Sequence, residues 1–256
     1  MLGLAVRAAY VPAFAGQSRS RTTAGRATAG ADSKLNAEWS DDDLRELTRI
    51  ARKYRITDPE FILRVMGSES GMHPWAVNKA SDGSPVAVGL LQFTRIATKS
   101  LRITEAEWAT IPAKSVREQL VLVDRFYASQ PWTKAGRVYD AASTVYMANA
   151  APNLMLSKGV SLDTVLYDAE KNPDAYNGNK GLDVEKKGYI TVRDLARRLD
   201  KIEKMPSYQE MVKRLRSVGG YGEGGGMSGA SMWLAWGAVA VVAGGIAYAT
   251  LSQKAA

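Results

Sequence analysis

One stretch of this 256-residue chain does most to predict its fold: PEFILRVMGSESG, residues 59–71. Phe61, Val65 and Glu69 recur at intervals of four, which places them on one face of a helix. The helix is expected to break at Ser70-Gly71, where its apolar pattern stops. The stretch therefore predicts a helix with a glutamate at the end of its apolar face.

A glutamate that continues an apolar face is uncommon in proteins. Burying an unpaired carboxylate is costly, and the group responds by raising its pKa and becoming neutral. A raised pKa is what a general acid needs near neutral pH, and the helix break puts Glu69 at the edge of a cleft. The alternative interpretation is a structural glutamate capped by local hydrogen bonds, and periodicity alone leaves both open.

The composition narrows the chemistry that the chain can carry. It has no cysteine and one histidine, His73, which excludes disulfides, thiol catalysis and multi-histidine metal centres. Acid–base work therefore falls mainly to carboxylates. With 34 Lys and Arg against 26 Asp and Glu, the net charge of +8 suits polyanionic surroundings: nucleic acid, anionic lipid or an acidic cell-wall polymer.

Helical periodicity dominates residues 39–217, and strand-like alternation is scarce. Ser40 followed by three aspartates is a helix start, and apolar residues continue at helical spacing to Tyr54. The predicted fold class is mainly α, with one helical domain at residues 39–217. After the helix that begins at Pro59, further helices are expected at residues 87–99, 112–129, 136–151, 191–204 and 206–217.

Both ends of the chain differ from this domain. We interpret residues 1–38 as a basic, disordered arm, while a secretory signal with Ala13-Phe14-Ala15 as its cleavage site is the alternative. A Gly-rich linker follows the domain at residues 218–229. Residues 230–251 are apolar or small, and a helix of that length covers ~33 Å, enough to span a bilayer. We expect a single transmembrane helix there, with a buried core helix as the alternative.

Three pieces of sequence resemble a known family. They are Glu69-Ser70-Gly71, then Gly89-Leu90-Leu91-Gln92-Phe93, and finally VYMANAAP at residues 145–152. In this order and spacing they resemble the soluble lytic transglycosylase family, in the variant seen in phage-encoded members. Goose-type lysozymes share the fold of that family. The resemblance spans residues 40–155 and implies a lysozyme-like helical domain.

The resemblance also implies an activity, that of a peptidoglycan lytic transglycosylase. Glu69 would be the sole acid and base: it would protonate the β-1,4 glycosidic oxygen between MurNAc and GlcNAc, then deprotonate the muramic acid 6-hydroxyl to close a 1,6-anhydro ring. Met147 breaks the usual Tyr-Asn pair of the family. A helix cap and a core position are the structural alternatives for the glutamine and the tyrosine. Four residues are implied as substrate-binding: Ser70, Gln92, Tyr146 and Asn149.

Other functions compete with this one. A hydrolytic lysozyme would use a second carboxylate, and the loop after Glu69 holds one acid, Asp82. Asp82 stands in a Ser-Asp-Gly-Ser context that is typical of a turn. A second alternative is a non-catalytic, membrane-anchored virion or envelope structural protein. The arginines of the arm lack a recognised nucleic-acid motif, so no specific nucleic-acid partner is expected.

Residues 183–194 have the register of an EF-hand calcium loop, with acids at positions one, three and twelve and Gly188 at position six. Lys187 stands at position five, where a calcium ligand belongs. We therefore expect a fold-stabilising turn that starts the helix at 191–204, with calcium binding as the alternative. The prediction includes no metal and no cofactor.

The predicted protein is a membrane-anchored enzyme that degrades cell walls. Its partners would be peptidoglycan glycan strands, a lipid bilayer through residues 230–251, and other virion or envelope proteins. The expected location is a bacteriophage virion, in its membrane or entry apparatus, where the enzyme would open the wall locally during entry. A bacterial envelope facing the periplasm is the alternative.

Overall fold

The computed structural model describes residues 35, 37–80, 82–157 and 159–219. All of them belong to one compact unit of the chain, which ends at Gly219. This part is mostly helical, so the mainly α fold class is confirmed.

Three predicted segments lie wholly or largely outside the described residues. They are the transmembrane helix at residues 230–251, nearly all of the basic arm at residues 1–38, and the Gly-rich linker at residues 218–229. The first two residues of that linker, Val218 and Gly219, are described and are helical. Within the part of the chain that is described, no helix combines the length and the apolar character needed to cross a bilayer.

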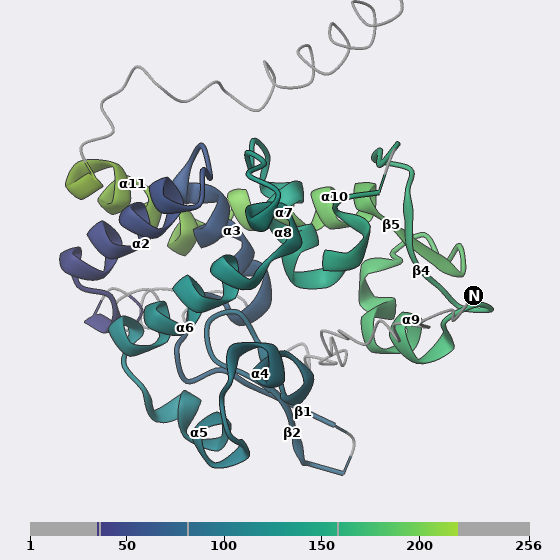
Figure 1. The fold of residues 1–256 in the computed structure, drawn as a ribbon, viewed down its shortest axis with the longest axis horizontal. Helices are drawn as coiled ribbons and strands as arrows, with labels where there is room; N and C mark the ends of the chain where they lie inside the picture. Colours follow the sequence, from purple (N-terminus) through teal and green to yellow (C-terminus); the bar gives the residue numbers. More distant parts are fainter. Residues whose placement is uncertain (1–34, 36, 81, 158, 220–256) are drawn as a thin grey trace, which may run out of the picture. The chain divides into compact units, whose positions relative to one another are not determined.

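A central helix, α3 (Pro59–Ser70), organises the fold. On one side it packs against α2 (Asp41–Lys53) and α11 (Pro206–Gly219), and on the other against α8 (Ala142–Ala150) and α10 (Val192–Glu203) (Figure 1). Nine of the twelve residues of α3 are buried, so this helix forms much of the core. Its apolar residues on more than one face explain why other helices surround it.

The ends of the first two helices follow the sequence signals. At the start of α2, Ser40 and Asp43 form a capping box in which each side chain accepts the other's backbone N–H. The Asp58 carboxylate accepts the Glu60 N–H at 2.8 Å and so caps α3. Gly71 ends α3 in the left-handed region at φ +64°, which confirms the predicted break.

Two predicted helices are shorter than expected. The helix predicted at 112–129 begins only with α6 (Val116–Ser129), after a 3-10 turn. The helix predicted at 136–151 begins only at Ala142, because the backbone of Tyr139 is bonded elsewhere. Its N–H donates to the Arg55 carbonyl at 3.0 Å, and its carbonyl accepts the Thr57 N–H at 2.9 Å.

The helix predicted at 87–99 is wrong for most of its length. Val86, Ala87 and Val88 belong to β2 (Pro85–Val88), which pairs antiparallel with β1 (Val77–Lys79) and with β3 (Phe93–Thr94). Between these strands, Gly89 at φ +77° and Gln92 at φ +51° have left-handed backbones that a right-handed helix excludes. Only the last part of the segment is helical, in α4 (Arg95–Leu101).

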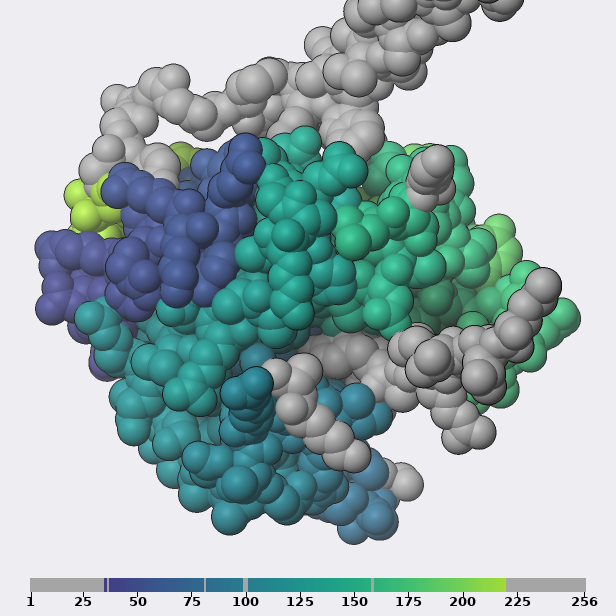
Figure 2. Space-filling view, viewed as in Figure 1, coloured from purple at the N-terminus to yellow at the C-terminus, as the bar shows by residue number. Residues whose placement is uncertain are grey.

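A second small sheet lies beside α10 (Figure 1). It pairs β4 (Val165–Asp168) with β5 (Tyr189–Thr191). In the space-filling view the green surface of this region adjoins the teal surface formed by residues 116–150 (Figure 2). With two small sheets, the described part has more strands than the sequence pattern predicts.

The remaining named elements are short: α5 (Glu105–Thr110), η1 (Ile111–Ala113), α7 (Pro131–Lys134), η2 (Pro152–Leu154), α9 (Pro173–Asn179) and η3 (Lys180–Leu182).

Candidate functional site

Glu69 lies in the last turn of α3, with its side chain partly buried. Its Oε1 atom is enclosed and has no hydrogen-bond partner among the described residues. Burial raises the pKa of this carboxyl to about 8, and the Tyr146 hydroxyl and Arg198 guanidinium oppose the rise because both stabilise the charged form. The group is therefore mostly protonated at neutral pH, as a general acid must be.

Three buried tyrosines lie within electrostatic range of Glu69: Tyr127 on α6, Tyr146 on α8 and Tyr167 on β4. Burial raises the pKa of each phenol, and the negative charge of Glu69 is among the groups that raise it further. The Tyr167 hydroxyl donates to the Ala150 carbonyl, while the Tyr127 hydroxyl has no partner in the described part. All three phenols therefore stay neutral at neutral pH, and Tyr167 is the one whose hydroxyl donates a hydrogen bond to the backbone.

Ser68 joins Tyr146 to a cation on α10. The Ser68 hydroxyl donates to the Tyr146 oxygen at 3.1 Å. Arg198 donates from Nε to Ser68 Oγ at 3.2 Å and from Nη2 to the Ser68 carbonyl at 3.3 Å. The helices approach closely because Gly67 has no Cβ: one built there would lie 2.6 Å from Cγ2 of Ile202. These contacts bring α3, α8 and α10 together around Glu69.

Ser70, a predicted substrate ligand, holds a loop to the end of α3. Its Oγ lies 3.0 Å from the Met66 carbonyl and 2.9 Å from the Leu90 carbonyl. A hydroxyl carries one hydrogen, so it donates to these two acceptors in turn. The geometry gives Ser70 a role in placing the loop at Leu90 beside Glu69, and it adds no support for contact with substrate.

Gln92 is also turned toward its own backbone. Its Nε2 donates to the Gly89 carbonyl at 2.9 Å and to the Ala76 carbonyl at 3.3 Å, and its side chain is buried. It precedes β3, so it stands at no helix start and caps no helix. Here too the structure shows a loop-shaping role and leaves the predicted contact with a glycan without support.

Gln119 on α6 completes this loop, and the sequence did not single it out. Its Oε1 accepts the Leu90 N–H at 2.9 Å, and its Nε2 donates to the Pro74 carbonyl at 2.7 Å. Gly89 leaves room for it, because a Cβ built there would lie 2.5 Å from Gln119 Oε1. A fully buried glutamine thus ties the GLLQ segment to the chain that follows α3.

Asn149 lies three residues after Tyr146 and so near the same face of α8. It is fully buried, and neither Oδ1 nor Nδ2 has a partner among the described residues. A buried amide without hydrogen-bond partners lowers the stability of a folded protein by about 1–3 kcal/mol. The structure brings Asn149 close to Tyr146 along the helix, yet offers it no accessible surface on which a glycan could lie.

Asp82, the second carboxylate of the lysozyme alternative, stands exposed in the turn between β1 and β2. Its Oδ1 accepts the Ser84 N–H at 2.8 Å and the Ser84 hydroxyl at 2.6 Å, which lowers its pKa. In the described part, the groups that act on the pKa of Glu69 are a tyrosine and an arginine, and no carboxylate is among them. Asp82 behaves as a turn residue.

The loop at residues 183–194 is closed by hydrogen bonds to the side chain of its first residue, Asp183. The carboxylate of Asp183 accepts the backbone N–H groups of Lys187 at 3.0 Å and Gly188 at 2.8 Å. The Lys187 ammonium reaches the buried Asp194 carboxylate at 2.8 Å, and so places a positive charge within the loop. Among the described residues, no group of three or more His, Cys, Asp or Glu side chains could hold a metal ion. Asp194 also caps α10 through Thr191, which confirms the predicted helix start.

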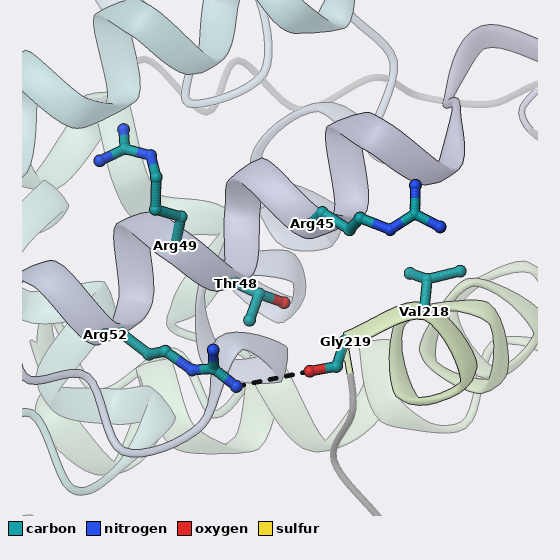
Figure 3. Close-up of a pocket in the computed structure, with 6 residues that line it drawn as sticks. All are labelled: Arg45, Thr48, Arg49, Arg52, Val218 and Gly219. Carbon is teal, nitrogen blue, oxygen red and sulfur yellow. Dashed lines mark hydrogen bonds between the residues drawn. The ribbon is translucent and has the colours of Figure 1, made fainter.

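Two cavities lie near these elements. One of about 270 Å³ lies between α2 and the end of α11, where Arg52 donates to the Gly219 carbonyl at 3.4 Å (Figure 3). Its lining includes none of the residues around Glu69. The other, of about 300 Å³, follows α10 and the 183–194 loop, and Arg198 is in its lining.

Comparison with protein-family models, curated proteins and solved structures found no match to this chain. The residues around Glu69 that the sequence did not reveal are Ser68, Tyr127, Tyr167 and Arg198. The sequence held a signal for Ser68 alone, because it directly precedes Glu69 on the same helix. The other three residues lie in segments that are distant from Glu69 in the sequence.

Proposed function

We propose that this chain is a peptidoglycan lytic transglycosylase with Glu69 as its acid and base. The observation that carries the proposal is the Glu69 carboxyl in the last turn of α3, whose Oε1 is enclosed and has no hydrogen-bond partner among the described residues. Burial raises the pKa of this carboxyl to about 8, which suits a general acid. The sequence pattern around Glu69, Gln92 and Tyr146, which resembles the soluble lytic transglycosylase family, supports the same function.

The reaction needs a single carboxyl group. Glu69 gives its proton to the glycosidic oxygen, the bond from that oxygen to C1 of MurNAc breaks, and GlcNAc leaves with the new hydroxyl. The substrate's own acetamido group stabilises C1 as an internal nucleophile. The Glu69 carboxylate then takes the proton of the 6-hydroxyl, whose oxygen bonds to C1 and closes the 1,6-anhydro ring as the bond from the acetamido oxygen to C1 breaks and the acetamide is restored. No water is consumed, and Glu69 ends the cycle protonated.

The position of Asp82 favours this reaction over hydrolysis. Glycosidases with two carboxyl groups hold them ~5–5.5 Å apart when retaining and ~6.5–9.5 Å apart when inverting. A carboxylate at such a distance would raise the pKa of Glu69, and none of the carboxylates in the described part of the chain contributes. The exposed turn that holds Asp82 supports a structural role for that residue.

In this proposal the enzyme works at a membrane. Residues 230–251 anchor it through the Gly-rich linker, and the helical part adopts a lysozyme-like fold. A bacteriophage virion that penetrates the cell wall during entry is the setting that we propose. The support is the uncharged apolar sequence of the anchor and a net charge of +8, which attracts an acidic wall polymer.

A digestion of purified peptidoglycan tests the proposal. The full chain in mild detergent is compared with Glu69→Gln and with a control variant, Glu170→Gln, that changes an exposed glutamate. Mass spectrometry of the products should show 1,6-anhydro ends with the wild type and the control only. Reducing ends would indicate a lysozyme, and no cleavage by the wild type would refute an enzymatic function.

A further inference from the structure

Glu69 stands at the carboxyl end of α3, where a negative charge is unfavourable. The aligned peptide dipoles leave partial negative charge at this end of a helix, and a cation there is stabilising. α3 has no basic residue in its own last turn. Arg198 of α10 supplies the cation, and it also satisfies the Ser68 carbonyl, one of the last four of the helix.

The hydrogen bonds around Ser68 have a defined direction. Arg198 Nε can only donate, so Ser68 Oγ accepts from it at 3.2 Å. The single hydrogen of Ser68 goes to the Tyr146 oxygen at 3.1 Å. Tyr146 accepts this bond and keeps its own hydrogen for another acceptor. Tyr146 stabilises the charged form of the Glu69 carboxyl, which makes that carboxylate the expected acceptor of this hydrogen.

We propose that Arg198 and Ser68 are positioning residues for Glu69, acting through the Arg198–Ser68–Tyr146 chain. This hydrogen-bond chain points the Tyr146 hydrogen at Glu69 whenever the carboxyl has lost its proton, and Arg198 adds a nearby positive charge. The inference rests on the proposed function, in which Glu69 must regain a charge in the middle of the reaction. In that step the hydrogen-bond chain stabilises the Glu69 carboxylate, which accepts the 6-hydroxyl proton.

In the described part of the chain, the other elements packed around α3 contribute no charged group to the pKa of Glu69. Tyr127 on α6 and Tyr167 on β4 are neutral phenols. On α11, Arg216 is bound to Glu60 in the first turn of α3, at the opposite end of the helix. Among the described residues, Arg198 is thus the charged group that acts on the pKa of Glu69.

Titration of the Glu69 carboxyl by ¹³C NMR tests this inference without requiring activity. The full chain in mild detergent is compared with Arg198→Met, Arg198→Lys and Ser68→Ala, and with Lys201→Met as a control that removes an exposed charge from the same helix. Arg198→Met should move the midpoint up by about one pH unit, as expected for the loss of a nearby cation. Arg198→Lys should restore at least half of the shift, and Lys201→Met should leave the midpoint in place.

The kinetics of peptidoglycan cleavage provide a second test of the inference. Ser68→Ala keeps the cation but removes the hydrogen donor to Tyr146, so kcat should fall about tenfold with KM unchanged. The basic limb of the pH profile should move up in Arg198→Met together with the NMR midpoint. An Arg198→Met protein that folds and titrates like the wild type would overturn the inference while leaving the proposed function intact. A wild type that cleaves nothing would refute the proposed function. The NMR titration midpoint of the variants would still decide whether the Arg198–Ser68–Tyr146 hydrogen bonds act on Glu69.

Discussion

Replacing Glu69 by glutamine should stabilise the folded protein, and the gain should grow with pH. The pKa of the folded carboxyl is about 8, whereas the ordinary value is 4.5. Between these values the folded state binds more protons than the unfolded state, so the wild type loses stability as pH rises through this window. Glutamine has a similar shape and does not titrate, and the variant avoids this loss.

The magnitude follows from the width of the window. For each pH unit in which only the folded carboxyl is protonated, the free energy of unfolding of the wild type falls by about 1.4 kcal/mol. From pH 4.5 to pH 7 the cost reaches about 3 kcal/mol, and by pH 9 it reaches about 5 kcal/mol. At pH 4 both states are protonated, so the pH-dependent gain of Glu69→Gln disappears there.

Urea unfolding followed by tryptophan fluorescence measures this difference at pH 4, 5.5, 7 and 8.5. The free energy of unfolding of Glu69→Gln minus that of the wild type should rise steadily across the series. Glu170→Gln, at an exposed position, should show no such trend. A difference for Glu69→Gln that is constant from pH 4 to pH 8.5 would refute a buried, protonated Glu69 and remove the main support for its role as an acid.

Three further predictions concern the surroundings of the site. Gly89→Ala should lower the free energy of unfolding in urea by about 2 kcal/mol or more, because its Cβ would lie 2.5 Å from Gln119 Oε1 at φ +77°; Gly83→Ala, at φ +83° but in open space, should cost about 1 kcal/mol, and equal losses would contradict the close-packing argument. Lys187→Asp places a carboxylate in the loop where the ammonium now meets Asp194, so calcium should raise the Tm of this variant and leave that of the wild type unchanged; a wild type stabilised by calcium would show that the ammonium does not replace the ion. Asp82→Asn should change the rate of peptidoglycan cleavage less than twofold, and a loss of a hundredfold or more would favour a two-carboxylate lysozyme mechanism.

Local patterns predicted α3 well because its signals are contained within one turn or one face. The cap at Asp58, the apolar repeat through Phe61 and Val65, and the glycine at residue 71 all act over a few residues. The same signals placed Glu69 on an inward-facing position near the helix end. The EF-hand-like turn at residues 183–194 was predicted for the same reason.

The segment from residue 87 to residue 99 shows where local patterns are insufficient. Its residues fit a helix by composition, but β2 gains backbone partners from β1 and β3 on both sides. Gln119, distant in sequence, holds the turn between β2 and β3. Such long-range bonds outweigh the small helix propensities of single residues.

The sequence by itself determined a mainly helical chain without thiol or multi-histidine chemistry, and it marked Glu69 as the carboxyl most suited to acid catalysis. Only the tertiary structure decided what surrounds that carboxyl. Tyr146 and Arg198 come from α8 and α10, far from α3 in the chain, and Ser68 links them. Burial and charge are properties of the packed neighbourhood, so the raised pKa of Glu69 and the groups that moderate it appear only when the helices meet.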